Sequence, residues 1–500
     1  MTLFEQFPIL LVVLPMFVGP LLAIVPSRGH LPWAIATATS AVVFLIAISL
    51  THQVLLDGTI FYELGNWPVP FGIGLVITPF SALMVLIITG ASLVALLVAF
   101  HSMPPEVGYQ HQSLLYSCWL LALTGLVGIA ISGDAFNIFV FMEISSLAAY
   151  VMVANGPNRR ALTASFNYLV TGTTGATMYL IGVGYLYMMT GSLNLMDISE
   201  RISDISDTLP VMIAAGFIVL GLALKAALFP MHAWMPNTYQ FAPTPVAIFF
   251  AACSTKVALF VMMRFEFVVL LPNLGEPAYF LSSLLIPLAV AAFLVGSVIA
   301  IFERDLKRML GYSSVAQLGY IVLAISLASS AGITAAVLHF FNHALIKAAL
   351  FVAVAAMILR YGSDNIDKLA GVGRRMPLTS FAFVLAGLSL IGVPLTAGFI
   401  SKWYLIQAVL EEPGLGILLT ILILVSSLMA VVYIWKVVEV AYLKAPPDQS
   451  LQDIKRQEAP ALVLVVLWSL VIANIWFGIN PSLPLTLAGM EVVELLGVGR

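Results

Sequence analysis

Charged residues are scarce in this sequence. Asp, Glu, Lys and Arg together make up 9% of the chain, whereas soluble domains carry about 25%, and this excludes a large soluble enzyme. Cysteine is almost absent: Cys118 and Cys253 lie inside apolar runs and lack the spacing of a metal site. We expect both to be small buried residues without a redox role. No Lys or Arg precedes Arg28, so residues 1–25 lack the basic region of a cleavable signal and are expected to be retained.

Long apolar runs fill the rest of the chain. Hydrophobic residues make up 61% of the sequence, and many runs reach the roughly 20 residues that a membrane-spanning helix needs. We therefore predict an all-α polytopic membrane protein that forms one continuous helical bundle. Runs bounded by Pro, Gly and charged residues give fourteen predicted helices. Their ranges are 7–25, 32–50, 73–100, 113–132, 135–153, 162–189, 210–229, 243–264, 279–302, 313–329, 333–359, 380–410, 416–438 and 460–479.

The basic residues predict a topology with both termini outside, because loops on the inner side of a membrane are enriched in Lys and Arg. Fourteen of the 21 basic residues then fall in inside loops, and of the 24 acidic residues only Glu143 falls inside a predicted helix. The inside residues are Arg28, Arg159, Arg160, Arg304, Lys307, Arg308, Arg360, Lys368, Arg374, Arg375, Lys436, Lys444, Lys455 and Arg456. Those outside are Arg201, Arg264 and Arg500, and those within the spans are Lys225, Lys256, Lys347 and Lys402.

Two predicted helices contain breaks. Residues 210–240 are expected to break at Pro230 and Pro236, and residues 380–410 at Pro394 and Gly398. Broken helices in corresponding halves of a sequence indicate a transport site built on inverted repeats.

The spacing of the buried polar groups is similar in the two halves. Glu143 and Gln317 are 174 residues apart, and Lys225 and Lys402 are 177 apart. This similarity favours an internal repeat.

The five charges inside the spans require an explanation. Each ionised group at a helix centre costs about 2.5–3.5 kcal/mol, so Glu143 and the four lysines must pair, lose their charge, reach the membrane surface or line water. Burial destabilises the charged form of both lysine and glutamate, and an opposite charge restores it. A lysine whose partner comes and goes could therefore take up and release a proton.

The predicted helix 333–359 carries a polar stripe. His339, His343 and Lys347 are spaced by four residues and share one helical face, with Asn342 beside it. The stripe suits a proton relay, because neutral imidazole can accept and donate a proton. The alternative is that these histidines are core residues whose hydrogen bonds are all made within the protein. A zinc site is not expected here, because the sequence has no third ligand with matching spacing. His232, after Pro230, is either a helix cap or a relay.

Five long motifs carry a resemblance to a known family. The motifs are GDAFNIFVFMEISS, LKAALFPMHAWMPNTYQFAPTPVAIFFAACSTKVALFVMMRF, ERDLKRMLGYSSVAQLGY, LHFFNHALIKAALF and GVPLTAGFISKW. In these motifs the chain resembles the antiporter-like subunits shared by respiratory complex I, membrane-bound hydrogenases and Mrp-type cation/proton antiporters, over residues 113–438.

The resemblance implies fourteen helices and two inverted five-helix repeats. The repeats would be residues 113–264 (helices 4–8) and 279–438 (helices 9–13), with the seventh and twelfth helices broken. Residues 1–112 would form three preceding helices, and residues 439–500 the last helix and a short tail.

The resemblance also implies the roles of the polar residues. Glu143 would pair with Lys225, Lys256 would be the central lysine, and Lys402 the terminal lysine of a polar axis along which protons move. The stripe of His339, His343 and Lys347 would belong to this axis, and His232 and Gln317 are possible relays.

Within the family the chain most resembles the D-type chain of Mrp antiporters. We therefore expect a membrane subunit of a bacterial or archaeal Na⁺ or K⁺/proton antiporter, assembled with other membrane subunits in the cell membrane. We expect no redox site, cofactor, metal or nucleic acid in this chain. The alternatives are an N-like proton-pumping subunit of NADH:quinone oxidoreductase or of a hydrogenase complex, and a scaffold with an idle axis. Asn167 stands where many relatives have a lysine, and this position bears on proton uptake.

Overall fold

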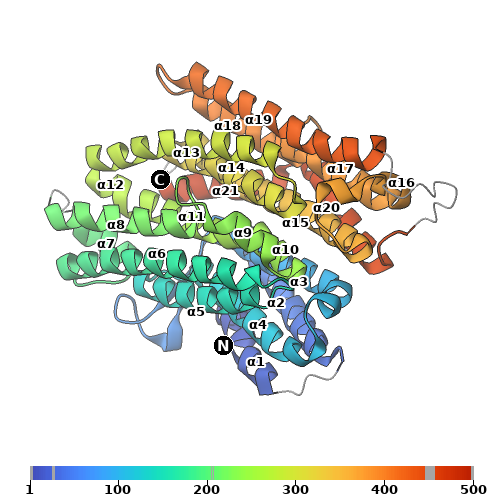
Figure 1. The fold of residues 1–500 in the computed structure, drawn as a ribbon. Helices are drawn as coiled ribbons and strands as arrows, with labels where there is room; N and C mark the ends of the chain where they lie inside the picture. Colours follow the sequence, from blue (N-terminus) through green and yellow to red (C-terminus); the bar gives the residue numbers. More distant parts are fainter. Residues whose placement is uncertain (1–3, 25–28, 204, 206–207, 445–456, 497–500) are drawn as a thin grey trace.

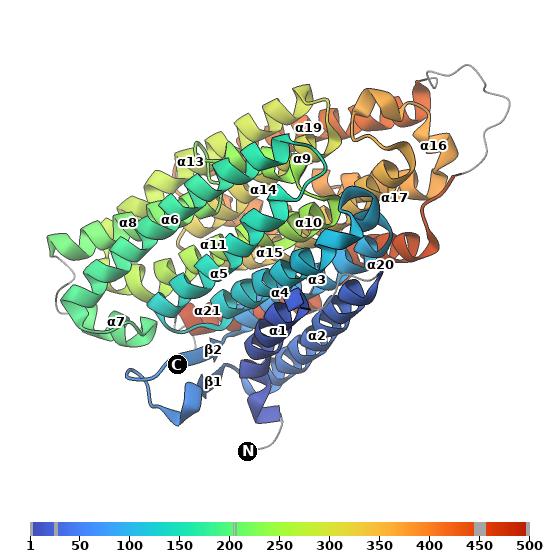
Figure 2. The ribbon, with the colours of Figure 1, turned by 60° about the horizontal axis from the view of Figure 1, so that its bottom comes forward.

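The computed structural model describes residues 4–24, 29–203, 205, 208–444 and 457–496, and only the backbone of residues 277, 278 and 280. Arg28, Lys455, Arg456 and Arg500, to which the topology prediction assigned sides of the membrane, lie outside the described residues. The described part is nearly all helical, with the long helices side by side in one bundle (Figures 1 and 2).

The predicted class of polytopic membrane protein is confirmed. Among the described residues, eleven helical runs are long and apolar enough to cross a membrane, and α8 and α17 are shorter apolar helices. A helix suits this environment because it satisfies every backbone polar group within the segment. The count of fourteen crossings stays a prediction.

Most helices pack against helices that lie close to them in the sequence. The N-terminal part contains α1 (Phe7–Ile24), α2 (Leu31–Asp57), β1 (Ile60–Glu63), β2 (Gly74–Ile77) and α3 (Pro79–Glu106). The next part contains α4 (Tyr109–Ile131), α5 (Ala135–Ala154), α6 (Arg160–Thr190), α7 (Leu195–Ile202), α8 (Leu209–Lys225), α9 (Trp234–Phe241), α10 (Thr244–Phe249), α11 (Thr255–Arg264) and α12 (Leu271–Leu274). The last part contains α13 (Glu276–Phe302), α14 (Leu306–Ser326), α15 (Ser330–Tyr361), α16 (Val372–Arg375), α17 (Pro377–Ile391), α18 (Ala397–Leu410), α19 (Gly416–Val438), α20 (Ala461–Ile479) and α21 (Ser482–Leu496).

The two ends of the described chain meet at one end of the bundle. Tyr62 donates a hydrogen bond to Gln6 (2.7 Å), and Thr59 donates one to Glu494 of α21 (2.5 Å). We call this end, which carries β1, β2, α7 and α21, the terminal face. The opposite end carries the loop before α6, the loop before α14 and α16, and we call it the basic face (Figure 2).

The third helix begins later than the sequence predicted. Residues 74–77 form β2, antiparallel to β1, and α3 starts at Pro79 rather than at 73. Thr78 caps the helix by accepting a hydrogen bond from the Ser81 N–H (3.1 Å), and Pro79 suits the first helical position because its missing N–H would have no partner there.

The helical run that carries Lys256 is longer than predicted and continues to Leu274 through a π-helical segment, Phe265–Leu270. The prediction that Arg264 lies in an outside loop is therefore wrong. Arg264 is 6% exposed and donates a hydrogen bond to the Ser132 carbonyl (2.7 Å). Glu266, 1% exposed, is a further acidic residue inside a helical run. A carbonyl and a hydroxyl satisfy these groups, and partners of this kind cannot be recognised from a single sequence.

Both predicted breaks exist, but only one of the two residues named for each lies within it. The first break covers residues 226–233 and contains Pro230, whereas Pro236 lies in the first turn of α9, where proline is tolerated. The second covers residues 392–396 and contains Pro394, whereas Gly398 lies in the first turn of α18. A Cβ at Gly398 would lie 1.8 Å from the Ser389 carbonyl oxygen, so this glycine permits the close approach of α17 and α18.

Helix α8, which ends at Lys225, packs closely on α6 through glycines. A Cβ at Gly221 would lie 2.6 Å from both the Gly175 carbonyl oxygen and the Tyr179 nitrogen. Small residues at such contacts let membrane helices approach each other closely.

We expect Gly221→Ala to force α6 and α8 apart and to destabilise the protein by about 1–3 kcal/mol, the usual range for overpacking. A lower thermal unfolding midpoint and a lower yield of the purified protein in detergent would show this. Gly216→Ala is the matched control, because a Cβ there meets no atom within 4 Å and alanine favours a helix. Equal stability of the two variants would contradict the close contact.

Candidate functional site

Glu143 of α5 and Lys225, the last residue of α8, form a loose ion pair. The Lys225 Nζ lies 3.5 Å from the Glu143 Oε1 and only 2.7 Å from the Ser146 hydroxyl oxygen. The Lys225 side chain is 7% exposed and the Glu143 side chain 25%. Since Ser146 is the nearer partner, the lysine keeps a hydrogen bond when the ion pair opens.

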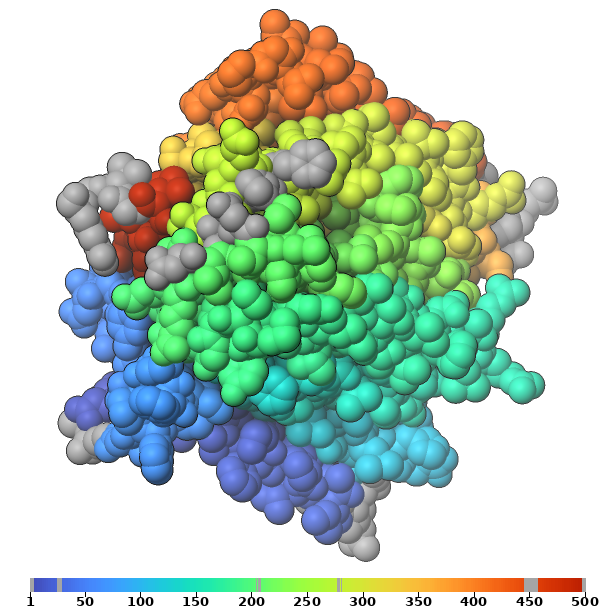
Figure 3. Space-filling model, turned by 90° about the vertical axis from the view of Figure 1, so that its left-hand side faces the viewer, coloured from blue at the N-terminus to red at the C-terminus, as the bar shows by residue number. Residues whose placement is uncertain are grey.

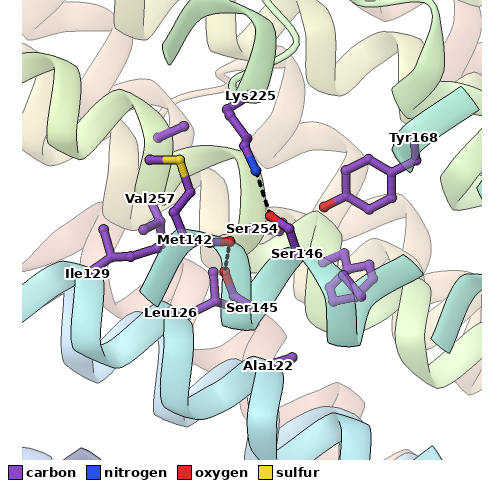
Figure 4. A pocket seen from close by; sticks show the side chains of 13 residues that line it. Ala122, Leu126, Ile129, Met142, Ser145, Ser146, Tyr168, Lys225, Ser254 and Val257 are labelled. Atoms are coloured by element: carbon purple, nitrogen blue, oxygen red, sulfur yellow. Dashed lines mark hydrogen bonds between the residues drawn. The ribbon is translucent and has the colours of Figure 1, made fainter. Parts of the chain in front are cut away.

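A small cavity adjoins Lys225 and Ser146. Its volume is about 30 Å³, which is room for one or two water molecules, since each needs roughly 10–15 Å³. Lys225, Ser146, Tyr168 and Ser254 line it together with apolar residues. The Tyr168 ring and the Lys225 ammonium approach the cavity from different sides (Figure 4). The cavity therefore connects Lys225 to the turn that precedes Lys256.

Lys256 is completely buried and has a backbone partner. It follows a π-helical segment, Phe250–Ser254, and its Nζ donates a hydrogen bond to the Ala251 carbonyl (2.9 Å). Such π segments occur frequently at functional sites because they interrupt the regular hydrogen-bond ladder. Within the described part of the chain, no carboxylate lies within 4.0 Å of this ammonium.

The stripe on α15 is buried and shares one face, as its spacing predicted. The His339 and His343 rings lie 5.9 Å apart and nearly parallel, and His339 Nδ1 forms a hydrogen bond with Ser401 of α18 (2.9 Å). Lys347 donates to the Leu310 carbonyl (2.8 Å) and to the Ser313 hydroxyl of α14.

Several polar atoms of this stripe lack a protein partner. Among the described residues, neither His343 nitrogen forms a hydrogen bond, nor do His339 Nε2 and Asn342 Oδ1, although each residue is at most 2% exposed. Buried polar atoms in proteins are nearly always paired, so each such atom needs an explanation. The Asn342 Nδ2 donates a hydrogen bond to the carbonyl of Ala397, which follows the second helix break (2.6 Å).

Lys402 of α18 lies against the second break. Its Nζ donates to the carbonyls of Leu390 (3.1 Å) and Ile391 (2.8 Å), the last residues of α17, and to the Ser427 hydroxyl (3.0 Å). These carbonyls carry the partial negative charge of a helix C-terminus, which stabilises a cation. Tyr320 connects this lysine to the stripe: its ring lies 5.2 Å from the Lys402 Nζ and 5.8 Å from the His339 ring.

The three remaining residues singled out from the sequence lie in different surroundings. His232 is in the first break, stacked on Phe229 at 5.3 Å, and its Nδ1 has no partner among the described residues. Gln317 of α14 is 2% exposed, and in the described chain its Oε1 is also without a partner. Asn167 is on the exposed side of α6, whereas its neighbour Tyr168 lines the cavity. The asparagine therefore does not contribute to the Lys225 site.

The hydroxyl partners of the lysines were missed in the sequence analysis. Ser146 follows Glu143 by three residues, and Ser313 precedes Gln317 by four, so each shares a helix face with a residue already singled out. This spacing could have indicated Ser146 and Ser313 as partners. Helical spacing gave no such signal for Ser427, which comes from another helix.

The chain matches a known family along most of its length. A family model described as NADH:quinone oxidoreductase/Mrp antiporter, TM, matches residues 132–430. The N-type chain of the NADH-quinone oxidoreductase of Desulforudis audaxviator is 39% identical over 484 residues, which cover 94% of this chain and 95% of that protein. The D-type chain of the Na(+)/H(+) antiporter of Alkalihalophilus pseudofirmus is 30% identical over 400 residues, 80% of each chain.

Two solved structures share the fold. A chain of the membrane-bound sulfane sulfur reductase, an archaeal respiratory membrane complex, is 31% identical with a TM-score of 0.89 and 98% of both chains covered. A chain of the Mrp complex from Dietzia sp. DQ12-45-1b has a TM-score of 0.88, with 99% of this chain and 98% of that chain covered. At 24% identity, the second likeness concerns the fold alone.

Proposed function

The chain belongs to the NADH:quinone oxidoreductase/Mrp antiporter transmembrane family, and on this premise we propose that it is the proton-translocating membrane subunit of a multisubunit antiporter. This antiporter exchanges a monovalent cation, Na⁺ or K⁺, for protons. The D-type chains of Na(+)/H(+) antiporters among its relatives support this assignment.

The observation that carries the proposal is the loose pair of Glu143 and Lys225. The pair has a second acceptor, Ser146, and a water-sized cavity beside it. When Glu143 and Lys225 are close, the lysine keeps its proton, because an opposite charge stabilises the ammonium. When the pair opens, the buried ammonium loses that support and releases a proton towards the cavity and Ser254.

We assign the further steps to the other buried polar groups. The proton passes by way of Lys256 to the stripe of His339, His343 and Lys347, and then to Lys402, with His232 and Gln317 as possible relays. The packing of α15 on the π segment before Lys256 supports this order, and so does the position of Tyr320 between His339 and Lys402. The unpartnered histidine nitrogens supply the sites at which a proton can be exchanged.

The proposal includes the arrangement in the membrane. We propose fourteen crossings, with residues 113–264 and 279–438 as inverted repeats, between residues 1–112 and residues 439–500. The terminal face would be outside a bacterial or archaeal cell membrane, because the predicted inside loops carry most of the basic residues.

Partner subunits would cover part of the lateral surface. Glu143 is one quarter exposed, and an ionised carboxylate in lipid costs about 2.5–3.5 kcal/mol on insertion scales, so a protein neighbour at that position would lower the cost. The solved relatives are chains of multisubunit complexes, which supports such neighbours.

A second candidate function is the N-like proton-pumping subunit of a NADH:quinone oxidoreductase. The 39% identity to an N-type chain over 484 residues favours it. In that assembly, electron transfer would take place in partner subunits and would drive the same proton steps in this chain.

Flux measurements with the native complex in proteoliposomes test the two functions. If the antiporter proposal holds, an imposed Na⁺ or K⁺ gradient moves protons in the opposite direction, without any electron donor. Proton movement that requires NADH and a quinone would support the second function instead. If neither condition moved protons, both would be wrong.

A further inference from the structure

A cavity at the terminal face lies outside the axis described above. Its volume is about 490 Å³, and its lining comes from the strand region, α7, the end of the Lys256 helix and the C-terminal helix α21. Figure 3 shows this face, with the blue strand region beside the red C-terminal segment. Arg264, Glu491, Glu494 and Glu200 are its charged lining residues.

Two of these charges are almost completely buried. Glu491 is 1% exposed and Arg264 6%. The Glu491 Oε2 accepts a hydrogen bond from the Phe80 N–H (2.9 Å), and Arg264 donates to the Ser132 carbonyl (2.7 Å). No ion pair within 4.0 Å joins the two in the described structure. Glu491 is therefore a buried carboxyl in the wall of the terminal-face cavity, with a cation nearby but, among the described residues, without a direct ionic partner.

The cavity adjoins the end of the helix that carries the central lysine. Arg264 follows Lys256 by eight residues in one helix, which places it about 12 Å farther towards the terminal face at 1.5 Å per residue. Helix α21 packs against both α15, which carries the histidine stripe, and α3. The same helices thus border the axis and the cavity.

Three phenylalanine rings, one each from α3, α11 and α15, pack against one another. The Phe80 ring lies 4.9 Å from the Phe260 ring and 5.1 Å from the Phe340 ring, centre to centre, and all three residues are 0% exposed. Phe260 is one turn beyond Lys256, and Phe340 is next to His339. A constriction of apolar rings excludes water and so interrupts a proton path.

We propose that Glu491 exchanges protons between the central axis and the terminal-face cavity, and that the Phe80 ring, anchored by the backbone hydrogen bond to Glu491, closes this connection between transfers. The inference rests on the proposed proton-translocating function and adds to it the residue that faces the outer side.

The transfer needs no further reagent. The Glu491 carboxylate takes up one proton from the axis side and becomes a neutral carboxylic acid, and it then gives the proton to water in the cavity and becomes a carboxylate again. The ionised form accepts the Phe80 N–H bond more strongly than the neutral form, because charged acceptors make stronger hydrogen bonds. Protonation of Glu491 therefore loosens the anchor of Phe80 at the moment of transfer.

The surroundings of Glu491 suit this exchange. Burial raises the pKa of Glu491 to about 7, and the nearby Glu494 also raises this pKa, whereas the Phe80 N–H, Thr78 and Arg264 lower it. Glu200 of α7 is the remaining charged group in the lining, and within the described residues neither α3 nor α15 adds a titratable one. Glu491 then releases its proton readily when the outer pH is above about 7 and holds it when the pH is lower.

A purely structural role, in which Glu491 only caps the start of α3, makes a different prediction. Glu491→Gln separates the two roles: the amide oxygen still accepts the Phe80 N–H, but the side chain no longer carries a proton. Glu63→Gln is the matched control, because Glu63 is an exposed carboxylate of β1 on the same face and does not line this cavity.

The experiment compares complexes that contain the wild type, Glu491→Gln or Glu63→Gln, in proteoliposomes with the terminal face outwards. Proton flux is measured at external pH values from 5.5 to 8.5, chosen as about 1.5 units on either side of 7. We expect Glu491→Gln to lose at least about tenfold in flux, and to lose the rise in flux around pH 7 that the wild type and Glu63→Gln retain. Wild-type flux in the variant, or a reduced flux with an unchanged pH dependence, would refute the exchange role. Absence of proton flux in the wild type would instead refute the proposed function itself, and this inference with it.

Discussion

Replacement of Lys225 by alanine is expected to reduce proton-coupled transport at least about 100-fold, the lower part of the range for a positioned proton-transfer group. The variant removes the ammonium, and Glu143 and Ser146 then have no proton carrier between them. The complex should still assemble, because the subunit proposed to cover the exposed quarter of Glu143 can still offer polar partners to the unpaired carboxylate. Flux in proteoliposomes that contain equal amounts of purified complex measures the effect.

Three further variants make this result specific. Lys368→Ala removes an exposed lysine at the basic face and should leave flux unchanged. If Glu143 and Lys225 act as one unit, Glu143→Ala should cause a similar loss, and the double variant should be no worse than either single one. Near-normal flux in Lys225→Ala would show that the pair has only a structural role.

The bundle and the polar stripe could be predicted because both depend on local patterns. Long apolar runs set the spans, and four-residue spacing put His339, His343 and Lys347 on one face. The ion pair of Glu143 and Lys225 came from family resemblance, since 82 residues separate the partners and nothing in the local sequence connects them.

Contacts that depend on tertiary packing could not be predicted. Glu491 and the Phe80 N–H are 411 residues apart in sequence and meet only because α21 folds back against α3. Arg264 was predicted to lie outside, at the end of the helix 243–264, yet the Ser132 carbonyl, just after α4, allows it to be buried inside a longer helical run. A charged residue near the end of an apolar run is either exposed or buried with a partner that is distant in sequence. The sequence of the run does not show which of the two applies.

The partners of the four lysines in the proposed axis differ in a way that bears on the mechanism. Of these four, Lys225 alone has a carboxylate within 4.0 Å among the described residues, whereas Lys256, Lys347 and Lys402 donate to backbone carbonyls and to serine hydroxyls. Neutral acceptors only partly offset the cost of burying a charge. Charges on neighbouring lysines also repel each other, so a proton at one site disfavours a proton at the next. The three lysines are therefore suited to carry the charge one after another rather than together.

Replacement of His343 by phenylalanine should separate transport from stability. Neither ring nitrogen of His343 has a hydrogen-bond partner in the described structure, so the variant removes no bond, and a ring of similar size can keep the stack on His339. We expect the free energy of unfolding to change by less than about 1.5 kcal/mol, as for swaps that conserve volume. Proton flux should fall at least about 100-fold, because phenylalanine cannot accept or donate a proton.

His52→Phe is the control for this variant, because His52 is an exposed histidine of α2. It should change neither flux nor the thermal unfolding midpoint. If His343→Phe retained full flux, His343 would be a core residue and protons would have to pass from Lys256 to Lys347 without it. If the variant lost stability and flux together, the unpartnered nitrogens would have to be bonded in the native complex, and the relay role of the stripe would lose its main support.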